Sequence, residues 1–237
     1  TVIVGSLVKN FPFGNLRVGK SKYLIVEACE YRAHFLHLKP KIIIFTNLER
    51  DHLDYYRDEN MLLDAFQAFA DTLPEDGTLI LNAADEGLKK LELPKANVVT
   101  YGLGVEANAQ ATERSVKDGY QRFHWSFPDK EGEAELQIPG AFNVSNAMAA
   151  MALADVFGID MKIVEKVLKN FPGIWRRFER LGEFEGATLI SDYGHHPTAI
   201  RETLKAAKEF FPARRIVLAF QPPQHNRTKN LFDEFVA

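Results

Sequence analysis

Short apolar runs recur along the first part of the chain, and each one ends in polar residues. The runs predict four strands, over residues 23–26, 42–45, 78–81 and 97–101. Continuous β-branched runs of this length are typical of strands buried on both faces of a parallel sheet. Apolar residues at helical spacing over 58–71 predict a helix between the second and third strands. This alternation of strand and helix favours an α/β layer architecture.

The pattern changes over residues 107–138, where apolar and polar residues alternate. A period of two predicts antiparallel strands with one buried face. Turn residues at Asp118-Gly119 and over Lys130–Gly132 divide the stretch into about three strands. The sequence therefore predicts a small antiparallel insertion in an otherwise mostly parallel sheet.

Helical periodicity returns after this stretch. A buried helix is expected over 143–157, and Asp160 is a suitable N-cap for a second helix that ends near Asn170. Beyond Pro172-Gly173 the expected elements are a strand over 187–191, a helix over 198–211 with Pro197 in its first turn, a strand over 215–220 and a helix over 228–236. We therefore predict a central α/β domain over 1–180 and the start of a second, Rossmann-like α/β domain over 181–237.

The composition is that of an ordinary globular protein, with 46% hydrophobic and 26% charged residues among 237. A net charge of −3 gives no general field for nucleic acid or an anionic membrane, so neither is expected as a partner. The single cysteine, Cys29, excludes an internal disulfide and is expected to be a buried, inert thiol. With no signal peptide in view, a reducing, cytoplasmic setting is predicted. The chain opens on Thr1 and not on Met, so we expect it to be a piece of a longer protein.

Polar residues cluster where the predicted strands end, which is where ligands bind in open parallel sheets. Glu27 follows the first strand, and His52 lies shortly after the second. A carboxylate and an imidazole suit a divalent metal that takes other ligands from a substrate phosphate. The alternative is that Glu27 is a solvated strand end and His52 a residue at a helix entry. Spacing alone leaves both interpretations open.

Three further sets of polar residues each have a functional and a structural interpretation. The run Asp192–Pro197 either recognises an anion or substrate at a helix N-terminus or forms a turn with surface histidines. Arg176 and Arg177 either clamp a phosphate or are ordinary connector residues. Asn143 and Asn146 lie one turn apart, and they either contact a base or ribose or mark a helix start that Asn143 caps.

Taken in chain order, these residues resemble the motifs of the Mur ligase family, the ATP-dependent amino-acid ligases of peptidoglycan synthesis. The two most specific motifs are Asp51-His52-Leu53-Asp54-Tyr55-Tyr56 and Asp192-Tyr193-Gly194-His195-His196-Pro197-Thr198, and they point to the branch that adds L-alanine to UDP-N-acetylmuramate. The other matching residues are Glu27 to Glu30, Thr46 to Arg50, Pro139-Gly140 with Asn143 and Asn146, Gly173 with Arg176 to Phe178, and Phe220 to Pro222 with Arg227-Thr228. The resemblance covers nearly the whole chain.

The resemblance implies a two-step reaction. The substrate carboxylate takes the γ-phosphate of ATP to form an acyl phosphate, and the amine of an amino acid then displaces phosphate to form an amide. ATP and Mg²⁺ are the implied cofactors, and UDP-N-acetylmuramate and an amino acid or short peptide are the implied small-molecule partners. The implied roles are Glu27 and His52 as Mg²⁺ ligands, Asn143 and Asn146 at the adenine, Arg177 at the phosphates, Asp192 at the ribose, and Tyr193, His195 and Arg227 at the amino-acid side. Glu27, His52 and Arg177 are the implied catalytic residues.

The sequence also departs from the family pattern. Cys29 stands where an Asp is usual, Phe142 where a His is usual, and Pro223-Gln224 where His-Arg is usual. The family's Gly-Lys-Thr phosphate loop and its UDP-sugar domain are absent from these residues, so we expect the chain alone to turn over ATP poorly. Two alternatives stay open. One is a recycling ligase that adds a preformed tripeptide, which Pro223-Gln224 favours and Asp192-Tyr193-Gly194 disfavours. The other is a non-catalytic nucleotide- or sugar-binding module.

Overall fold

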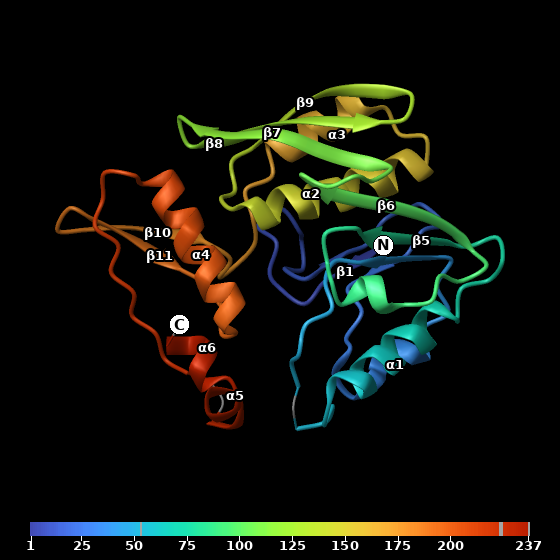
Figure 1. Cartoon of the computed structure of the whole chain (residues 1–237). Helices are drawn as coiled ribbons and strands as arrows, with labels where there is room; N and C mark the ends of the chain where they lie inside the picture. Colours follow the sequence, from blue (N-terminus) through green and yellow to red (C-terminus); the bar gives the residue numbers. More distant parts are fainter. Residues whose placement is uncertain (53, 223–224, 237) are drawn as a thin grey trace.

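The computed structural model describes residues 1–52, 54–222 and 225–236, so Pro223 and Gln224 lie outside the described residues. Its largest element is a six-stranded sheet with the order β4-β5-β6-β7-β8-β9 (Figure 1). The strands are β4 (Ile42–Phe45), β5 (Thr78–Asn82), β6 (Asn97–Leu103), β7 (Ala109–Lys117), β8 (Tyr120–Phe127) and β9 (Lys130–Leu136). Strands β4 to β7 pair in parallel, and β7 to β9 pair antiparallel. The predicted mostly parallel α/β sheet is therefore confirmed, and the antiparallel strands extend it.

Helices cover both faces of this sheet (Figure 1). One face carries α1 (Glu59–Ala70) and the 3-10 helix η1 (Tyr31–His37), and the other carries α2 (Ala141–Val156) and α3 (Met161–Lys169). The side chains of β5 alternate between the two layers. Leu79 and Leu81 are buried with the α1 side, whereas Ile80 is buried with the α2 side. Among the described residues, no helix has the length and apolar content that crossing a membrane requires.

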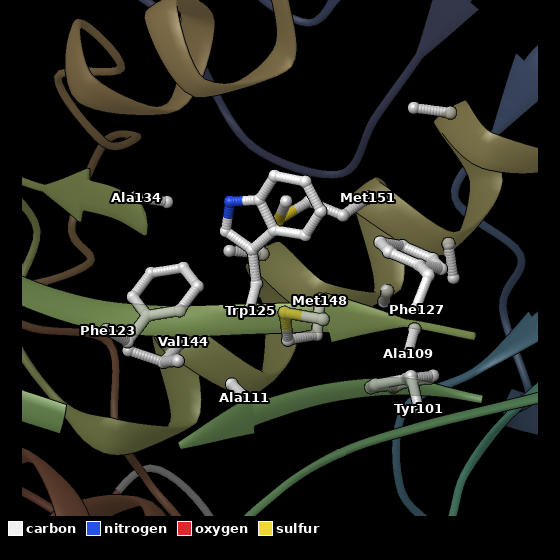
Figure 2. Close-up of a cluster of buried hydrophobic side chains, with 14 of the residues drawn as sticks. Tyr101, Ala109, Ala111, Phe123, Trp125, Phe127, Ala134, Val144, Met148 and Met151 are labelled. Atoms are coloured by element: carbon white, nitrogen blue, oxygen red, sulfur yellow. The ribbon is translucent and has the colours of Figure 1, made fainter. Parts of the chain in front are cut away.

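The core on the α2 side joins aromatic residues of β8 to methionines of the helix. Phe123, Trp125 and Phe127 occupy alternate positions of β8, and Met148 of α2 is buried among the same cluster (Figure 2). Alternation along the strand thus places every second side chain against α2. This packing explains why an Ala- and Met-rich helix is stable at this position.

We expect Met148→Ala to lower the free energy of unfolding by about 2–5 kcal/mol, because it empties a site with no solvent exposure. Met61→Ala on α1 is the matched control, since that side chain is 40% exposed. A change at an exposed site is expected to cost within about 0.5 kcal/mol. Urea unfolding of both variants gives the comparison, and equal losses would contradict the described packing.

The first predicted strand does not belong to the main sheet. β3 (Ile25–Val26) pairs in parallel with β1 (Val2–Ile3), which pairs antiparallel with β2 (Leu16–Arg17). Leu24 is 63% exposed, so the prediction that 23–26 is buried on both faces is wrong. The physical reason is that β3 lies at the edge of a small sheet whose strands are two residues long, and such a sheet buries few side chains.

The predicted turns and caps are confirmed in part. Asp118 and Gly119 both have positive φ, as a type I′ hairpin turn requires. The second turn is Pro128-Asp129, because Lys130–Gly132 belongs to β9. Asp160 caps α3 by accepting a hydrogen bond from the Lys162 amide at 2.9 Å.

The C-terminal part contains an antiparallel strand pair and three helices. These are β10 (Glu179–Phe184), β11 (Ala187–Ser191), α4 (Pro197–Phe210), α5 (His225–Asn230) and α6 (Phe232–Val236). The strand over 187–191 and the helix that opens with Pro197 are confirmed. The helix predicted over 228–236 is two short helices that meet at Leu231. The domain boundary predicted between residues 180 and 181 stays a prediction, and it falls within β10.

The strand predicted over 215–220 is wrong. This stretch has no strand pairing, and Val217 is 76% exposed. An apolar run indicates burial, but a strand exists only where a neighbour supplies ladder hydrogen bonds. In the described part of the chain, β10 and β11 pair only with each other.

Candidate active site

The loop that follows β4 is held by side chains at the end of β5. Asn82 Nδ2 donates to the Thr46 carbonyl at 2.8 Å. Asp85 Oδ1 accepts from the amides of Leu48 at 3.2 Å and Leu88 at 2.8 Å. The carboxyl ends of neighbouring parallel strands meet at one sheet edge, which is the edge where ligands bind in such folds. Sequence reasoning missed Asn82 and Asp85 as supports of this edge, although both follow a predicted strand.

Asp85 gives a prediction whose sign depends on pH. Burial raises the pKa of Asp85, so its charged form is less favourable in the folded chain than in the unfolded chain. The contribution of Asp85 to the free energy of unfolding is fully present below the unfolded pKa of about 3.9. It is lost as pH rises through the folded pKa. Asn keeps an accepting oxygen and removes the charge. We therefore expect Asp85→Asn to be more stable than wild type at pH 7, with no gain at pH 3.

The control for this prediction is Asp85→Ala. It removes the acceptor as well as the charge, and it is expected to cost about 1–3 kcal/mol because two amides lose their partner. Denaturant unfolding at pH 3 and pH 7 measures both variants. A loss in Asp85→Asn that equals the loss in Asp85→Ala at pH 7 would refute the burial argument.

Asp51 joins the loop after β4 to the C-terminal part of the chain. Its Oδ1 accepts from Arg227 Nε at 3.0 Å and Nη2 at 2.7 Å, and His195 Nε2 lies 3.9 Å from its Oδ2. Burial raises the pKa of the Asp51 carboxyl, but the interactions with His195 and Arg227 outweigh burial and hold this pKa well below its usual range. The Arg227 side chain is only 7% exposed. Two residues predicted at the amino-acid side thus meet on one carboxylate, which sequence reasoning did not include among the site residues.

A second contact joins the same two segments. Glu49 accepts a hydrogen bond from the Thr198 hydroxyl, and His196 Nε2 lies 3.2 Å from the Arg50 carbonyl. His196 Nδ1 is buried, has no hydrogen-bond partner within the described part of the chain and lies 3.8 Å from Glu49 Oε1. The loop after β4 and the start of α4 are therefore adjacent, and the candidate site lies between the main sheet and the C-terminal part.

The loop before α4 folds back on the connector. Asp192 accepts two backbone hydrogen bonds, one of them from the Phe178 amide at 2.8 Å. The guanidinium of Arg176 lies 5.0 Å from the ring centre of Tyr193, and that of Arg177 lies 5.9 Å from it. The structure thus brings Arg177 and Tyr193 together, and both Asp192 oxygens accept backbone hydrogen bonds, one from the connector and one from the loop. The phosphate and ribose roles stay predictions.

The two predicted metal ligands take separate partners. Glu27 Oε2 accepts from the Gly5 amide at 2.6 Å, whereas His52 Nε2 lies 3.0 Å from Glu30 Oε1. The described residues contain no group of three or more His, Cys, Asp or Glu suited to a metal. Mg²⁺ binds proteins through one or two side chains and takes water and substrate phosphates as its other ligands. Glu27 supplies an oxygen ligand of the kind that Mg²⁺ takes, and the roles of Glu27 and His52 as Mg²⁺ ligands stay a prediction. Cys29 is exposed, so the prediction of a buried thiol is wrong.

Asn143 and Asn146 lie in the first turns of α2. The helix begins at Ala141 after Gly140, so the prediction that Asn143 is its N-cap is wrong. Asn143 Nδ2 instead donates to the Pro139 carbonyl at 2.6 Å, and Asn146 Nδ2 lies 3.5 Å from Asn143 Oδ1. The two amides form a pair at the start of the helix, and their contact with adenine stays a prediction.

Comparison with known protein families assigns both parts of the chain. The Mur ligase middle domain matches residues 10–154, and the Mur ligase glutamate ligase domain matches residues 176–237. The chain belongs to the Mur ligase family. The resemblance inferred from the motifs is thereby confirmed.

Individual relatives support the same Mur ligase assignment over the whole chain. It is 40% identical to the UDP-N-acetylmuramate–L-alanine ligase of Clostridium perfringens and 38% identical to that of Caldanaerobacter subterraneus. These matches cover 100% and 99% of the chain but 52% and 51% of the relatives, so the chain spans about half the length of the curated relatives it matches.

Solved Mur ligase structures share the fold. The UDP-N-acetylmuramate-alanine ligase MurC of Thermotoga maritima has a TM-score of 0.81 and 30% identity, over 98% of this chain and 52% of that one. A murein peptide ligase from Psychrobacter arcticus has a TM-score of 0.63 and 25% identity, over 94% of this chain and 54% of that one. In this Mur ligase chain, the two matched regions supply opposite sides of the contact between Asp51 and Arg227.

Proposed function

We propose that the complete protein is an ATP-dependent ligase that joins L-alanine to UDP-N-acetylmuramate through an amide bond. The observation that carries this proposal is the meeting of Arg227 and His195 on Asp51, between the two matched Mur ligase regions. Relatives named for this activity, at 36–40% identity along the chain, support the choice of substrate. The predicted cytoplasmic setting agrees with small-molecule substrates.

The proposed reaction has two steps. The substrate carboxylate attacks the γ-phosphorus of ATP, releasing ADP and forming an acyl phosphate. The amine of L-alanine then attacks the acyl carbon, which forms the amide and releases phosphate, and the amine proton leaves to solvent. Each step develops negative charge on phosphate oxygens, so cationic groups placed in advance lower the barrier.

The residues that we assign to metal, phosphate and substrate binding come from both parts of the chain. Glu27 and His52 would hold Mg²⁺, which when bound neutralises phosphate charge. Arg177, whose guanidinium lies over Tyr193, would reach the transferring phosphate from the connector. We assign the remaining implied residues to binding, namely Asn143 and Asn146 to the adenine, Asp192 to the ribose, and Tyr193, His195 and Arg227 to the amino-acid side.

Arg227 suits the carboxylate of an amino acid. A guanidinium has five N–H donors. The two Arg227 donors that bind Asp51 fix the plane of the Arg227 guanidinium. The remaining donors are those that we assign to the substrate carboxylate. A side chain this buried makes stronger charge-assisted hydrogen bonds than a solvated one.

The second candidate is the recycling ligase that adds a preformed tripeptide. The similar fold of the murein peptide ligase from Psychrobacter arcticus supports it. Phosphate release by the complete protein, with ATP and UDP-N-acetylmuramate, separates the candidates. L-Alanine is expected to stimulate release, and the L-alanyl-γ-D-glutamyl-meso-diaminopimelate tripeptide is not. Stimulation by the tripeptide alone would favour the recycling ligase. Nucleotide or sugar binding with no release under either condition would favour a non-catalytic module.

A further inference from the structure

A relay of hydrogen-bonded side chains, Glu209, Arg114 and Gln121, links α4 to the turn before α2. Gln121 on β8 has no exposed surface, and its Nε2 donates to the carbonyls of Ile138 at 2.6 Å and Gly140 at 3.0 Å. Its Oε1 accepts from Arg114 Nε at 2.8 Å. Arg114 in turn binds Glu209 of α4, through Nη1 at 3.2 Å and through Nη2.

The Gln121 amide has a single orientation that satisfies its surroundings. Its oxygen faces a guanidinium donor, and its nitrogen faces two carbonyl acceptors, so a flipped amide would lose all three hydrogen bonds. The other core-facing positions of β8 hold Phe123, Trp125 and Phe127. A polar residue in this row is costly unless it is fully paired. Gln121 is fully paired, with one hydrogen bond from Arg114 of β7 and two to the turn before α2.

A β-bulge directs Arg114 toward Gln121. The register of β7 against β8 shifts within 112–115, and Glu113 has a φ of 52°. Ala111 is buried, whereas Glu113, the next residue in a regular alternation, is exposed. The Arg114 side chain is only 15% exposed. Since a bulge re-aims the side chains that follow it, Arg114 takes the inward position that Glu113 would hold in a regular strand.

The Gln121 end of this relay supports the first turn of α2. The Gly140 carbonyl also accepts from the Asn143 amide at 3.0 Å, and the Asn143 side chain donates to the Pro139 carbonyl. Gly140 has a φ of 95°, and a Cβ there would lie 2.3 Å from the Phe142 ring. The turn is thus a special backbone conformation, and Gln121 holds the carbonyl at its centre.

We propose that Arg114 and Gln121 are positioning residues that couple the placement of α4 to the turn that carries Asn143. Helix α4 packs against both β7 and α2, beside the end of the main sheet (Figure 1). Its seating fixes Glu209, which orients Arg114 and, through it, the Gln121 amide. The consequence for nucleotide affinity rests on the proposed function, in which Asn143 contacts the adenine.

Glu209→Ala in the complete protein tests the coupling, and Glu202→Ala on the same helix is the matched control. Glu202 pairs with Lys205 within α4, so its loss breaks an ion pair that does not lead to Arg114. We expect Glu209→Ala to speed amide hydrogen exchange severalfold in residues 141–146 and to weaken ADP binding about tenfold. Glu202→Ala is expected to change neither quantity.

A second variant probes the buried end of the relay. Gln121→Glu keeps an acceptor for Arg114 but loses the donors to both carbonyls, so exchange in residues 141–146 is expected to rise as in Glu209→Ala. The side chain of Glu209 is 39% exposed, so Glu209→Ala gives a result even where the core variant fails to fold. Faster exchange confined to α4 would overturn the proposal. Absence of nucleotide binding by the wild type would instead refute the proposed function, and the exchange data would still decide the relay.

Discussion

His52→Ala and Glu27→Ala are each expected to lower kcat for phosphate release by the complete protein about 10² to 10³-fold, the usual cost of losing one group that stabilises transition-state charge. His52 has a φ of 53°, which is uncommon for a residue with a side chain. Its Nε2 lies 3.0 Å from Glu30, and its amide donates to Asp51 Oδ1 at 2.7 Å. A residue whose ring and backbone amide both have hydrogen-bond partners, in a strained backbone conformation, is typical of a functional position.

The controls for this prediction carry the same changes at exposed sites. His37→Ala at the end of η1 and Glu59→Ala, whose partner is Lys90, are expected to keep kcat within about twofold, since surface changes away from a site cost little. Phosphate release is measured over a range of Mg²⁺ concentrations. Wild-type kcat and unchanged Mg²⁺ dependence in either site variant would remove that residue from the metal assignment.

Asp51→Asn is expected to raise the KM for L-alanine about tenfold or more, with a smaller change in kcat. The neutral amide leaves the Arg227 charge, which is 7% exposed, without its counter-charge. A hydrogen bond to a charged group contributes about 1.5–3 kcal/mol, which corresponds to a factor of at least about ten in an equilibrium constant. The predicted result is therefore a poorly positioned Arg227 and weaker binding of the amino acid.

The pH dependence of stability gives this prediction a second readout. The pKa of Asp51 is lowered in the folded chain, so its contribution is present above the unfolded pKa of about 3.9 and is lost as pH falls below it. Wild type is expected to lose stability relative to Asp51→Asn as pH is lowered below about 4. Asp76→Asn is the control. Asp76 pairs with Lys41 at an exposed site, where solvent screens the charges, so a smaller change in stability with pH is expected there. An unchanged KM in Asp51→Asn would contradict the positioning of Arg227 by this carboxylate.

Continuous apolar runs predicted the strands that have neighbours in the sheet. β4 and β5 form where the pattern placed them because both pair in parallel and helices cover their two faces. The same kind of pattern wrongly predicted burial on both faces over 23–26, where Ile25–Val26 forms an edge strand, and it wrongly predicted a strand over 215–220. Hydrophobicity records a tendency to be buried, and it carries no information about which strand supplies the hydrogen bonds.

The candidate site was predictable where motifs carry it and hidden where distant residues meet. The residues after β4 and before α4 were each recognised from local sequence. The pair of Asp51 and Arg227 joins positions 176 apart, and the pair of Arg114 and Glu209 joins positions 95 apart. A one-residue bulge decides which side of β7 faces α2, and no strand alternation predicts it.

The oxygen that leaves with phosphate tests the central claim most directly. UDP-N-acetylmuramate labelled with ¹⁸O in its carboxylate is incubated with the complete protein, ATP and L-alanine, and the released phosphate is analysed by mass. An acyl phosphate intermediate requires one carboxylate oxygen to remain on phosphorus, so phosphate carrying one ¹⁸O is the predicted result. Phosphate free of label, released together with the amide product, would contradict the account.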